Sequence, residues 1–180
     1  MWAWCDIANQ DIDLYLSNME LLIGKYGQGG TSGRQNPVSF VFMTGHHYYD
    51  YEDGEYAYNA KWQIKEHCEQ NHYWFYDFDD LECYDPDGNY FGDGTPEGGP
   101  FTGNRRLDED CSYRGAGGRR GNWGNEWIED NPGHELSLLA ADSNCVSCAH
   151  SQGDRYDDNS RLHCVLKGQA AWWLWARLAG

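Results

Sequence analysis

Two short apolar segments separated by a helix-compatible stretch constrain the fold of this chain more than any other feature. Residues 38–43 are β-branched and aromatic, are too few for a helix, and lie between a proline and a glycine. Residues 73–78 have a similar character, and residues 56–70 between them fit a helix. Because parallel neighbours need a long connection, this order predicts two parallel strands joined by a helical crossover.

Further segments extend this pattern into a three-layer α/β domain. Residues 12–23 carry apolar side chains at spacings of three and four, which predicts an amphipathic helix, and residues 162–178 predict a last helix. Residues 84–125 are rich in Gly, Asp, Asn, Pro and Arg, which predicts an irregular insertion with a helical turn near residues 123–128. We therefore predict that residues 1–180 form one α/β domain around a parallel sheet.

The charge of the chain argues against several classes of partner. The formal net charge is -16, and the basic residues number only 13 against 29 acidic residues. Such a chain repels nucleic acid and anionic lipid and attracts cations. No apolar run approaches the ~20 residues of a membrane span. We expect neither a nucleic-acid partner nor membrane insertion.

Seven cysteines in a loop-rich chain are more typical of an oxidising compartment than of the cytosol, which predicts a secreted protein. We expect Cys164 to form a disulfide with Cys145 or Cys148, since both lie in the loop before the last helix. Cys5 is the expected leftover thiol of this odd count. No signal peptide is visible, and the residues around Cys5 read as the end of another buried strand. We therefore expect an N-terminal part of the domain to precede Met1.

Polar residues follow each predicted strand, and they are Asp6, then Thr44, His46 and His47, then Asp77, Asp79 and Asp80. In an open parallel sheet, ligands bind beyond the carboxyl ends of the strands. A histidine with a carboxylate on its far nitrogen is a competent general base. The alternative stays open that His46 and Asp77 only cap their strands by hydrogen bonding to loop backbone.

Several motifs together resemble a known group of proteins. They are residues 1–5 (MWAWC), 42–46 (FMTGH), 76–82 (YDFDDLE), 84–90 (YDPDGNY), 148–151 (CAHS) and 176–180 (ARLAG). The chain resembles the downstream part of a group of uncharacterised secreted bacterial proteins, which is similar to the SGNH or GDSL-like hydrolases. The resemblance covers most of the chain and implies a flavodoxin-like or SGNH-like three-layer fold.

The resemblance also implies a site. In SGNH hydrolases a serine on the first strand is the nucleophile, and a late Asp-x-x-His supplies the acid and the base. His150 matches the late histidine, while Ser147 stands where the aspartate should be. The expected activity is hydrolysis of an ester on a polysaccharide, without a cofactor, with His150 as base and with Asp77 and His46 as further catalytic candidates. The chain has neither Gly-Asp-Ser nor Gly-x-Ser-x-Gly, so we expect these 180 residues to lack appreciable esterase activity by themselves. The competing hypothesis is a non-catalytic extracellular module for structure, assembly or adhesion.

An acidic loop is a candidate calcium site, with oxygen ligands at Asp85, Asp87, Asn89 and Asp93. The match to a calcium loop is partial, because Tyr90 replaces the turn glycine and a proline stands at the twelfth position. An ordinary turn rich in Asp, Gly and Asn is the alternative.

Three tryptophans crowd the last predicted helix at Trp172, Trp173 and Trp175. Adjacent residues of a helix point about 100° apart, so at least one of these indoles should meet another surface. That surface would be a partner subunit, a neighbouring domain or a sugar ring, unless an N-terminal part of the same protein covers it.

Overall fold

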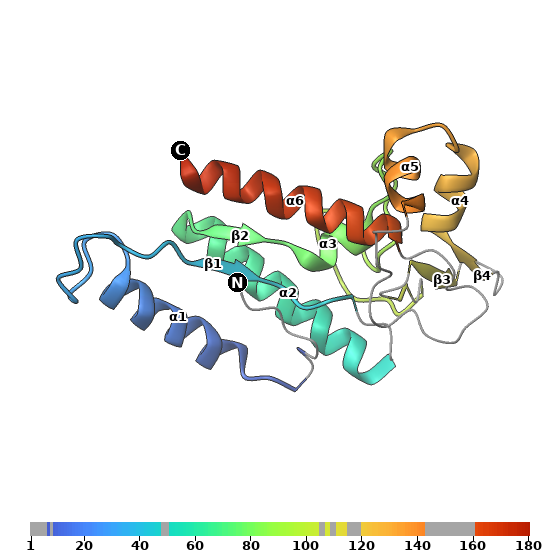
Figure 1. Ribbon diagram of the computed structural model, residues 1–180. Helices are drawn as coiled ribbons and strands as arrows, with labels where there is room; N and C mark the ends of the chain where they lie inside the picture. The colour runs from blue at the N-terminus through green and yellow to red at the C-terminus, as the bar shows by residue number, and fades with distance from the viewer. Residues whose placement is uncertain are drawn as a thin grey trace.

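The computed structural model describes residues 7, 9–47, 51–104, 107–108, 111–114, 120–142 and 161–180. Within these ranges, helices lie on both faces of a pair of short parallel strands, and a smaller helical lobe lies at one end (Figure 1). None of the helices in this part of the chain combines the length and apolarity that crossing a bilayer requires.

The strand pair is the one predicted from the two apolar segments. β1 (Val41–Met43) and β2 (Trp74–Tyr76) pair in parallel, and α2 (Tyr51–Asn71) connects them. The predicted parallel pair with a helical crossover is therefore confirmed. β2 is shorter than expected, because the chain leaves the ladder at Asp77 to begin another helix. β1 is shorter as well and begins only at Val41, opposite Trp74.

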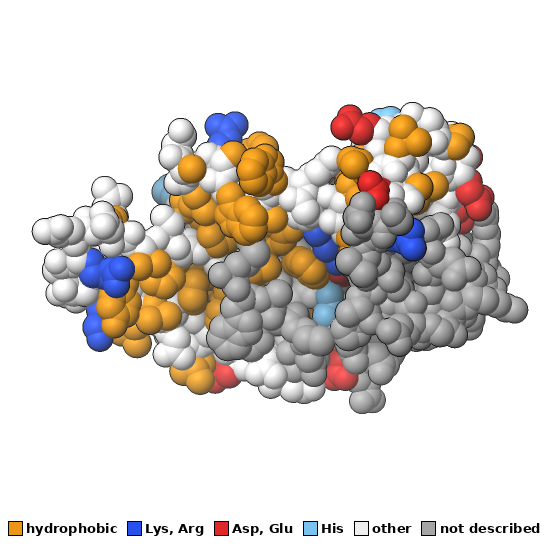
Figure 2. Space-filling model, in the orientation of Figure 1, with side chains coloured by type: hydrophobic (Ala, Val, Ile, Leu, Met, Phe, Trp, Pro, Cys, Tyr) orange, Lys and Arg blue, Asp and Glu red, His pale blue; other side chains and the backbone are white. Residues whose placement is uncertain are grey.

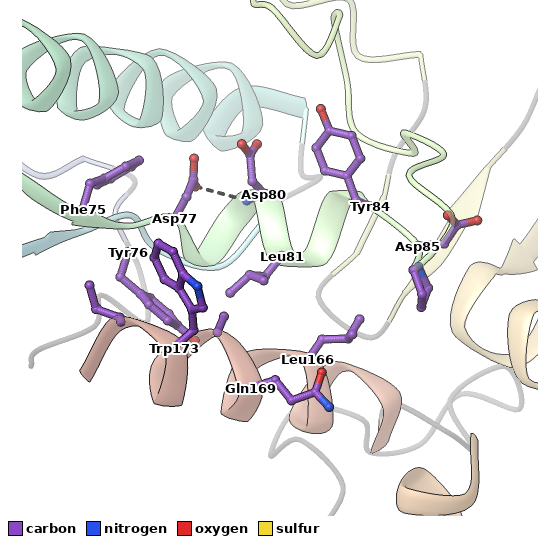
Figure 3. Close-up of a pocket in the computed structure, with 13 residues that line it drawn as sticks. Phe75, Tyr76, Asp77, Asp80, Leu81, Tyr84, Asp85, Leu166, Gln169 and Trp173 are labelled. Carbon is purple, nitrogen blue, oxygen red and sulfur yellow. Dashed lines mark hydrogen bonds between the residues drawn. The ribbon is translucent and has the colours of Figure 1, made fainter. Parts of the chain in front are cut away.

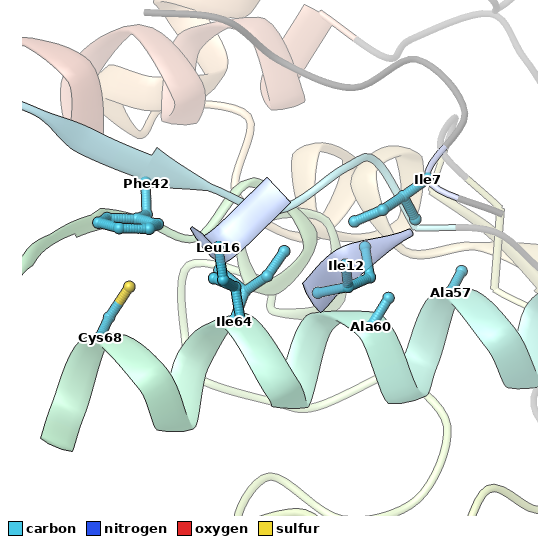
Figure 4. Packing of buried hydrophobic residues seen from close by; sticks show 8 residues of the cluster. All are labelled: Ile7, Ile12, Leu16, Phe42, Ala57, Ala60, Ile64 and Cys68. Carbon is cyan, nitrogen blue, oxygen red and sulfur yellow. The ribbon is translucent and has the colours of Figure 1, made fainter. Parts of the chain in front are cut away.

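α1 (Ile12–Tyr26) covers one face of the pair together with α2. It begins at Asp11, whose side chain accepts a hydrogen bond from the Leu14 backbone N at 2.8 Å. The helix continues past Gly24, where the predicted helix ended. Its apolar stripe joins a buried cluster, shown in Figure 4, of Ile7, Ile12, Leu16, Phe42, Ala57, Ala60, Ile64 and Cys68.

α6 (Arg161–Ala179) covers the other face, as the predicted last helix should. Side chains of a strand alternate between faces, so Phe42 meets α1 and α2 while Met43 meets α6. Met43, Tyr76 and Leu174 form the buried cluster on this side. The α/β class is therefore present in a two-stranded sheet covered on both faces.

Residues 84–125 contain more regular structure than their composition indicated. β3 (Ser112–Arg114) and β4 (Arg120–Asn122) form an antiparallel pair, because three-residue strands can pair without giving a readable period of two in the sequence. α4 (Trp123–Asp130) is longer than the predicted turn, and α5 (Glu135–Ala141) follows it. These helices pack on the first half of α6 in a second buried cluster.

The predicted sheet was larger than the one observed. In the described ranges the strands form two separate two-stranded sheets, β1 with β2 and β3 with β4. The third parallel strand was expected at residues 2–5, which lie outside the described residues.

Candidate functional site

The short helix α3 (Phe78–Cys83) organises the site, because it begins directly after β2 and presents two different faces. Asp77 is its N-cap and accepts a hydrogen bond from the Asp80 backbone N at 3.1 Å. Residues three and four apart share a face of a helix. The face that includes Asp77, Asp80 and Leu81 lines a cavity, whereas Asp79 belongs to a buried polar network on the opposite face.

Asp79 is the centre of that network, and three side chains contact its carboxylate. Lys61 Nζ donates to Asp79 Oδ1 at 2.6 Å, and His47 Nδ1 lies 3.0 Å from Asp79 Oδ2. The thiol of Cys83 lies 3.4 Å from Asp79 Oδ1. Burial alone would raise the pKa of Asp79, but the Lys61 ammonium and the His47 ring outweigh it and hold the pKa well below its usual range. Asp79 is therefore ionised at neutral pH.

Lys61 is the buried cation of the network, with 2% of its surface exposed. It lies on the inward stripe of α2 that also carries Ala57, Ile64 and Cys68. A buried ammonium costs several kcal/mol unless an anion pairs with it. Burial alone would lower the pKa of Lys61, but the Asp79 carboxylate outweighs this and raises it. The lysine and the aspartate therefore keep each other charged.

His47 is held at two points in the loop after β1. Its backbone N–H donates to Glu82 Oε2 at 2.5 Å, and its ring contacts Asp79. An ionised carboxylate can only accept, so Nδ1 carries the proton and Nε2 is the basic nitrogen. A histidine in this tautomer, with a carboxylate behind it, has the arrangement of a general base.

Glu82 joins the network to α6. Lys167 Nζ donates to Glu82 Oε1 at 2.5 Å, and Trp123 Nε1 donates to the Glu82 carbonyl oxygen at 3.0 Å. Burial raises the pKa of Glu82 to about 7, although Lys167 opposes the shift. Tyr76 Oη also donates to the Lys167 carbonyl oxygen at 2.7 Å. One residue of α6 therefore contacts both α3 and β2.

Cys83 could act in two ways here, as a nucleophile or as a metal ligand. His47, Asp79 and Cys83 offer N, O and S atoms within 4.8 Å of one another, a donor set that suits Zn²⁺. Burial raises the pKa of Cys83 well above its usual value, so the group is a thiol at neutral pH. Cys83 also contacts the same ring nitrogen of His47, at 3.3 Å, that faces Asp79, so the basic nitrogen does not activate it. The Lys61 ammonium already supplies the positive charge that this cluster needs.

The cavity lies between α3 and α6 and has a volume of about 700 Å³, in the ~300–1,000 Å³ range of ligand sites (Figure 3). Aromatic rings and apolar side chains form most of its lining, with a few polar groups among them. The aromatic members are Phe75, Tyr76, Tyr84 and Trp173, and the polar members are Asp77, Asp80, Asp85 and Gln169.

Asp77 is a carboxyl of the cavity lining with a raised pKa. Its Oδ1 accepts a hydrogen bond from Thr44 Oγ1 at 3.1 Å, while its Oδ2 is buried without a hydrogen-bond partner and lies 3.5 Å from Lys65 Nζ. Burial, assisted by the charges of Asp80 and Asp79, raises the pKa of Asp77 to about 7. Thr44 Oγ1 also accepts from the Asp79 backbone N at 3.0 Å, so one hydroxyl connects the two faces of α3.

Of the three predicted catalytic residues, the structure describes Asp77 and His46. Asp77 does bond to backbone, but it caps the helix α3 and not its strand, and it also lines the cavity. His46 Nδ1 donates to the His47 carbonyl oxygen at 2.9 Å, and His47 contacts the Asp79 carboxylate. His150 lies outside the described residues. The sequence did contain one signal for the network, which is Lys61 on an apolar helical stripe.

The candidate calcium ligands have protein partners. Asp85 Oδ1 accepts from the backbone N of Asp87 and Asn89 at 3.0 and 2.8 Å, and Asp87 Oδ2 accepts from Trp127 Nε1 at 2.8 Å. The carboxylate of Asp93 accepts from backbone N–H groups of a neighbouring loop. The contacts of Asp85 are those of an ordinary Asx turn, and the calcium site stays a prediction.

The predicted disulfide of Cys164 involves Cys145 or Cys148, and both of these lie outside the described residues. No disulfide joins any two of the cysteines within the described ranges, which are Cys68, Cys83, Cys111 and Cys164. Burial raises the pKa of Cys68 to about 12, which makes this thiol unreactive.

Comparison of the chain with protein-family models, with curated proteins and with solved structures gave no match. The assignment of function therefore depends on the geometry described above.

Proposed function

We propose that this chain is an SGNH-like hydrolase-type domain that acts on esters of a polysaccharide. The His47–Asp79 pair carries this proposal, because it combines a basic imidazole nitrogen with a buried carboxylate. The pair lies just beyond the carboxyl ends of two parallel strands. Ligands of open α/β sheets bind at that edge.

The chemistry follows from the tautomer. Nε2 of His47 accepts the proton of the attacking hydroxyl or water, and Asp79 stabilises the imidazolium that forms while remaining ionised. Lys61 holds Asp79 in place, with its ammonium 2.6 Å from the carboxylate. His150 is a second candidate base, from its place in the motif CAHS, and Asp77 and His46 remain the further candidates. The serine nucleophile is proposed to come from residues outside this chain, as the missing Gly-Asp-Ser motif indicates.

We also propose the fold type and the cellular compartment of the protein. β1 and β2 would contribute two strands to a three-layer parallel sheet of flavodoxin or SGNH type, and the helices on both of their faces support this. Seven cysteines and a net charge of -16 support secretion into an extracellular medium, where salt screens the charge. The reaction as written needs no cofactor.

The test is hydrolysis of an activated acetyl ester and of an acetylated polysaccharide, by the 180-residue chain and by a longer natural chain that contains it. We expect turnover by the longer chain and background rates from the 180 residues. His47→Gln and Asp79→Asn should each lower kcat of the longer chain by roughly 10²-fold or more, the usual contribution of a general base.

The matched control is His72→Asn, which removes an exposed histidine just after α2 and leaves the His47–Asp79 contact intact. A longer chain without esterase activity would refute the proposed function. If His150→Ala abolished turnover while His47→Gln left it unchanged, the base would be His150 and the His47–Asp79 pair would be structural.

A second candidate function is a non-catalytic assembly or adhesion module. It is favoured by the indoles of α6, because Trp172 and Trp175 are 73% and 53% exposed. Figure 2 shows hydrophobic side chains gathered on the face of the molecule that carries α6. Sedimentation velocity across a range of concentrations tests this function, since Trp172→Ser with Trp175→Ser should abolish any self-association.

A further inference from the structure

We infer that the cavity between α3 and α6 is a saccharide-binding subsite in which a sugar ring stacks on Trp173. The cavity lies on the face of α3 opposite Asp79, so this subsite is separate from the His47–Asp79 pair. The inference deepens the proposed function, because it places the polysaccharide on named residues. Binding can be measured without turnover, so the two can fail independently.

Trp173 is the platform because of where it lies on α6. All three indoles of this helix are exposed, Trp173 by 58%, but Trp173 lines the cavity whereas Trp172 and Trp175 do not. Figure 3 shows its ring standing between α6 and the start of α3. The face of an aromatic ring carries partial negative charge, and the C–H face of a sugar ring is apolar with partial positive hydrogens. The two surfaces are complementary in shape and charge.

The polar groups of the cavity match hydroxyls. Asp85 contributes a carboxylate to the lining, and its oxygens can accept hydrogen bonds from hydroxyls. Lys65 Nζ lies 2.9 Å from Asp80 Oδ2 and offsets the negative charge of this wall. Gln169 adds an amide from α6, which offers both as well.

Charge and polarity select among ligand classes. Lys65 contacts both Asp77 and Asp80, so the carboxylates of this wall are largely balanced and do not call for a cationic ligand. A purely apolar peptide segment would cover the Gln169 amide without offering it a hydrogen bond, which costs free energy. A neutral, hydroxyl-rich ring can form hydrogen bonds with the Gln169 amide and cover the aromatic lining at once.

The experiment measures binding of neutral oligosaccharides, built of β-1,4-linked glucose, xylose or mannose, to the 180-residue chain. Calorimetry gives the affinity, and tryptophan fluorescence reports the environment of the indoles. Trp173→Ala should weaken binding by about tenfold or more, the loss expected when one aromatic platform is removed. Gln169→Ala, at an exposed site where folding is not at risk, should weaken it by a smaller factor.

Trp172→Ala and Trp175→Ala are the matched controls, since each removes an exposed indole of the same helix, and both should stay within about twofold of the parent affinity. Binding by none of the oligosaccharides would overturn the inference. Equal losses in all three tryptophan variants would overturn it too, because they would indicate non-specific adhesion. An apolar peptide that binds with the same dependence on Trp173, where sugars do not, would assign the cavity to a protein partner instead.

Discussion

Lys61 sets the charge of the buried network, because it is the cation closest to Asp79 and is itself out of solvent. Removing one member of a buried ion pair leaves the other charge without compensation. Lys61 Nζ also lies 3.4 Å from Asp80 Oδ1, so removing Lys61 would also remove a positive charge beside the cavity face of α3.

We predict that Lys61→Met lowers the free energy of unfolding by about 3 to 5 kcal/mol, because Asp79 would stay buried as an unpaired carboxylate. Adding Asp79→Asn should recover part of the loss, since the charge disappears together with its partner. Lys65→Met is the control and should cost about 1 kcal/mol or less, because its ion pair with Asp80 is partly solvated. Urea denaturation of the parent chain and these three variants measures the differences. Equal losses at Lys61 and Lys65 would contradict the central place given to Lys61.

Glu82 and Asp77 give folding an unusual dependence on pH. Burial raises the pKa of each carboxyl to about 7 in the folded protein, from ordinary values of 4.5 and 3.8. The folded state therefore holds these protons more tightly than the unfolded state. The resulting stability is fully present below pH 4 and is lost as pH rises through 7.

We predict that the urea midpoint of the parent chain falls between pH 4.5 and pH 7.5, with Glu82 contributing on the order of 3 kcal/mol. Glu82→Gln keeps an oxygen acceptor but cannot ionise, so its midpoint should change less over the same range. Lys167, which donates to Glu82, is unchanged in that variant, so the difference between the two pH profiles reports the titration of Glu82. Parallel pH profiles for the two chains would show that Glu82 does not titrate in this window.

At the residue scale, the sequence indicated which types of residue form the site better than it indicated which of these residues contact one another. It placed His and Asp residues after parallel strands, and the structure brings such a pair together there. The choice of His47 over His46 depends on the turn after β1, because adjacent residues point in different directions. Lys167 and Glu82 meet across 85 positions of sequence, and no local pattern announces such a contact.

At the scale of elements, α6 depends on a small set of polar contacts. Tyr76 Oη donates to the Lys167 carbonyl oxygen, and the Lys167 side chain pairs with Glu82. The Lys167 ammonium also lies 4.0 Å from the ring centre of Phe78. The cavity opens beside this attachment, so the position of Trp173 follows from how α6 is held.

We predict that Tyr76→Phe costs about 1 kcal/mol of unfolding free energy, the net value of one hydrogen bond. The loss should appear locally, as faster amide hydrogen exchange along α6, because the missing bond joins α6 to β2. Tyr56→Phe removes a bond of the same kind, from an exposed tyrosine to the Gln10 carbonyl oxygen, and should leave α6 unchanged. Uniform acceleration across all helices in Tyr76→Phe would mean that α6 opens only by global unfolding.

Helix and strand positions were predictable where the apolar pattern was long. α1, α2 and α6 follow spacings of three and four, and the pair β1 and β2 follows from the crossover. Element ends were less predictable, because Gly24 is tolerated inside α1 and Asp77 caps α3 where a strand was expected to continue. β3, β4 and α5 are too short for periodicity to reveal them.

At the scale of the whole molecule, the net charge of -16 sets the response to cations. We predict that calcium raises the thermal midpoint relative to a chelator at constant ionic strength, if the loop from Asp85 to Asp93 binds it. Magnesium at the same ionic strength is the control, since screening acts alike for both ions. Equal midpoints in calcium and chelator would leave this loop as an Asx turn.

The four lysines, all within the described residues, divide into one in solvent and three in ion pairs. Lys61, Lys65 and Lys167 have side chains only 2%, 20% and 12% exposed, each against a carboxylate, while Lys25 at the end of α1 is exposed. Amine-reactive reagents need an accessible, deprotonated nitrogen, and the pKa of both Lys61 and Lys65 is raised. Under mild conditions such reagents should therefore modify Lys25 before any other side chain. That gives a defined attachment point for a fluorophore or a solid support on a helix that does not line the cavity.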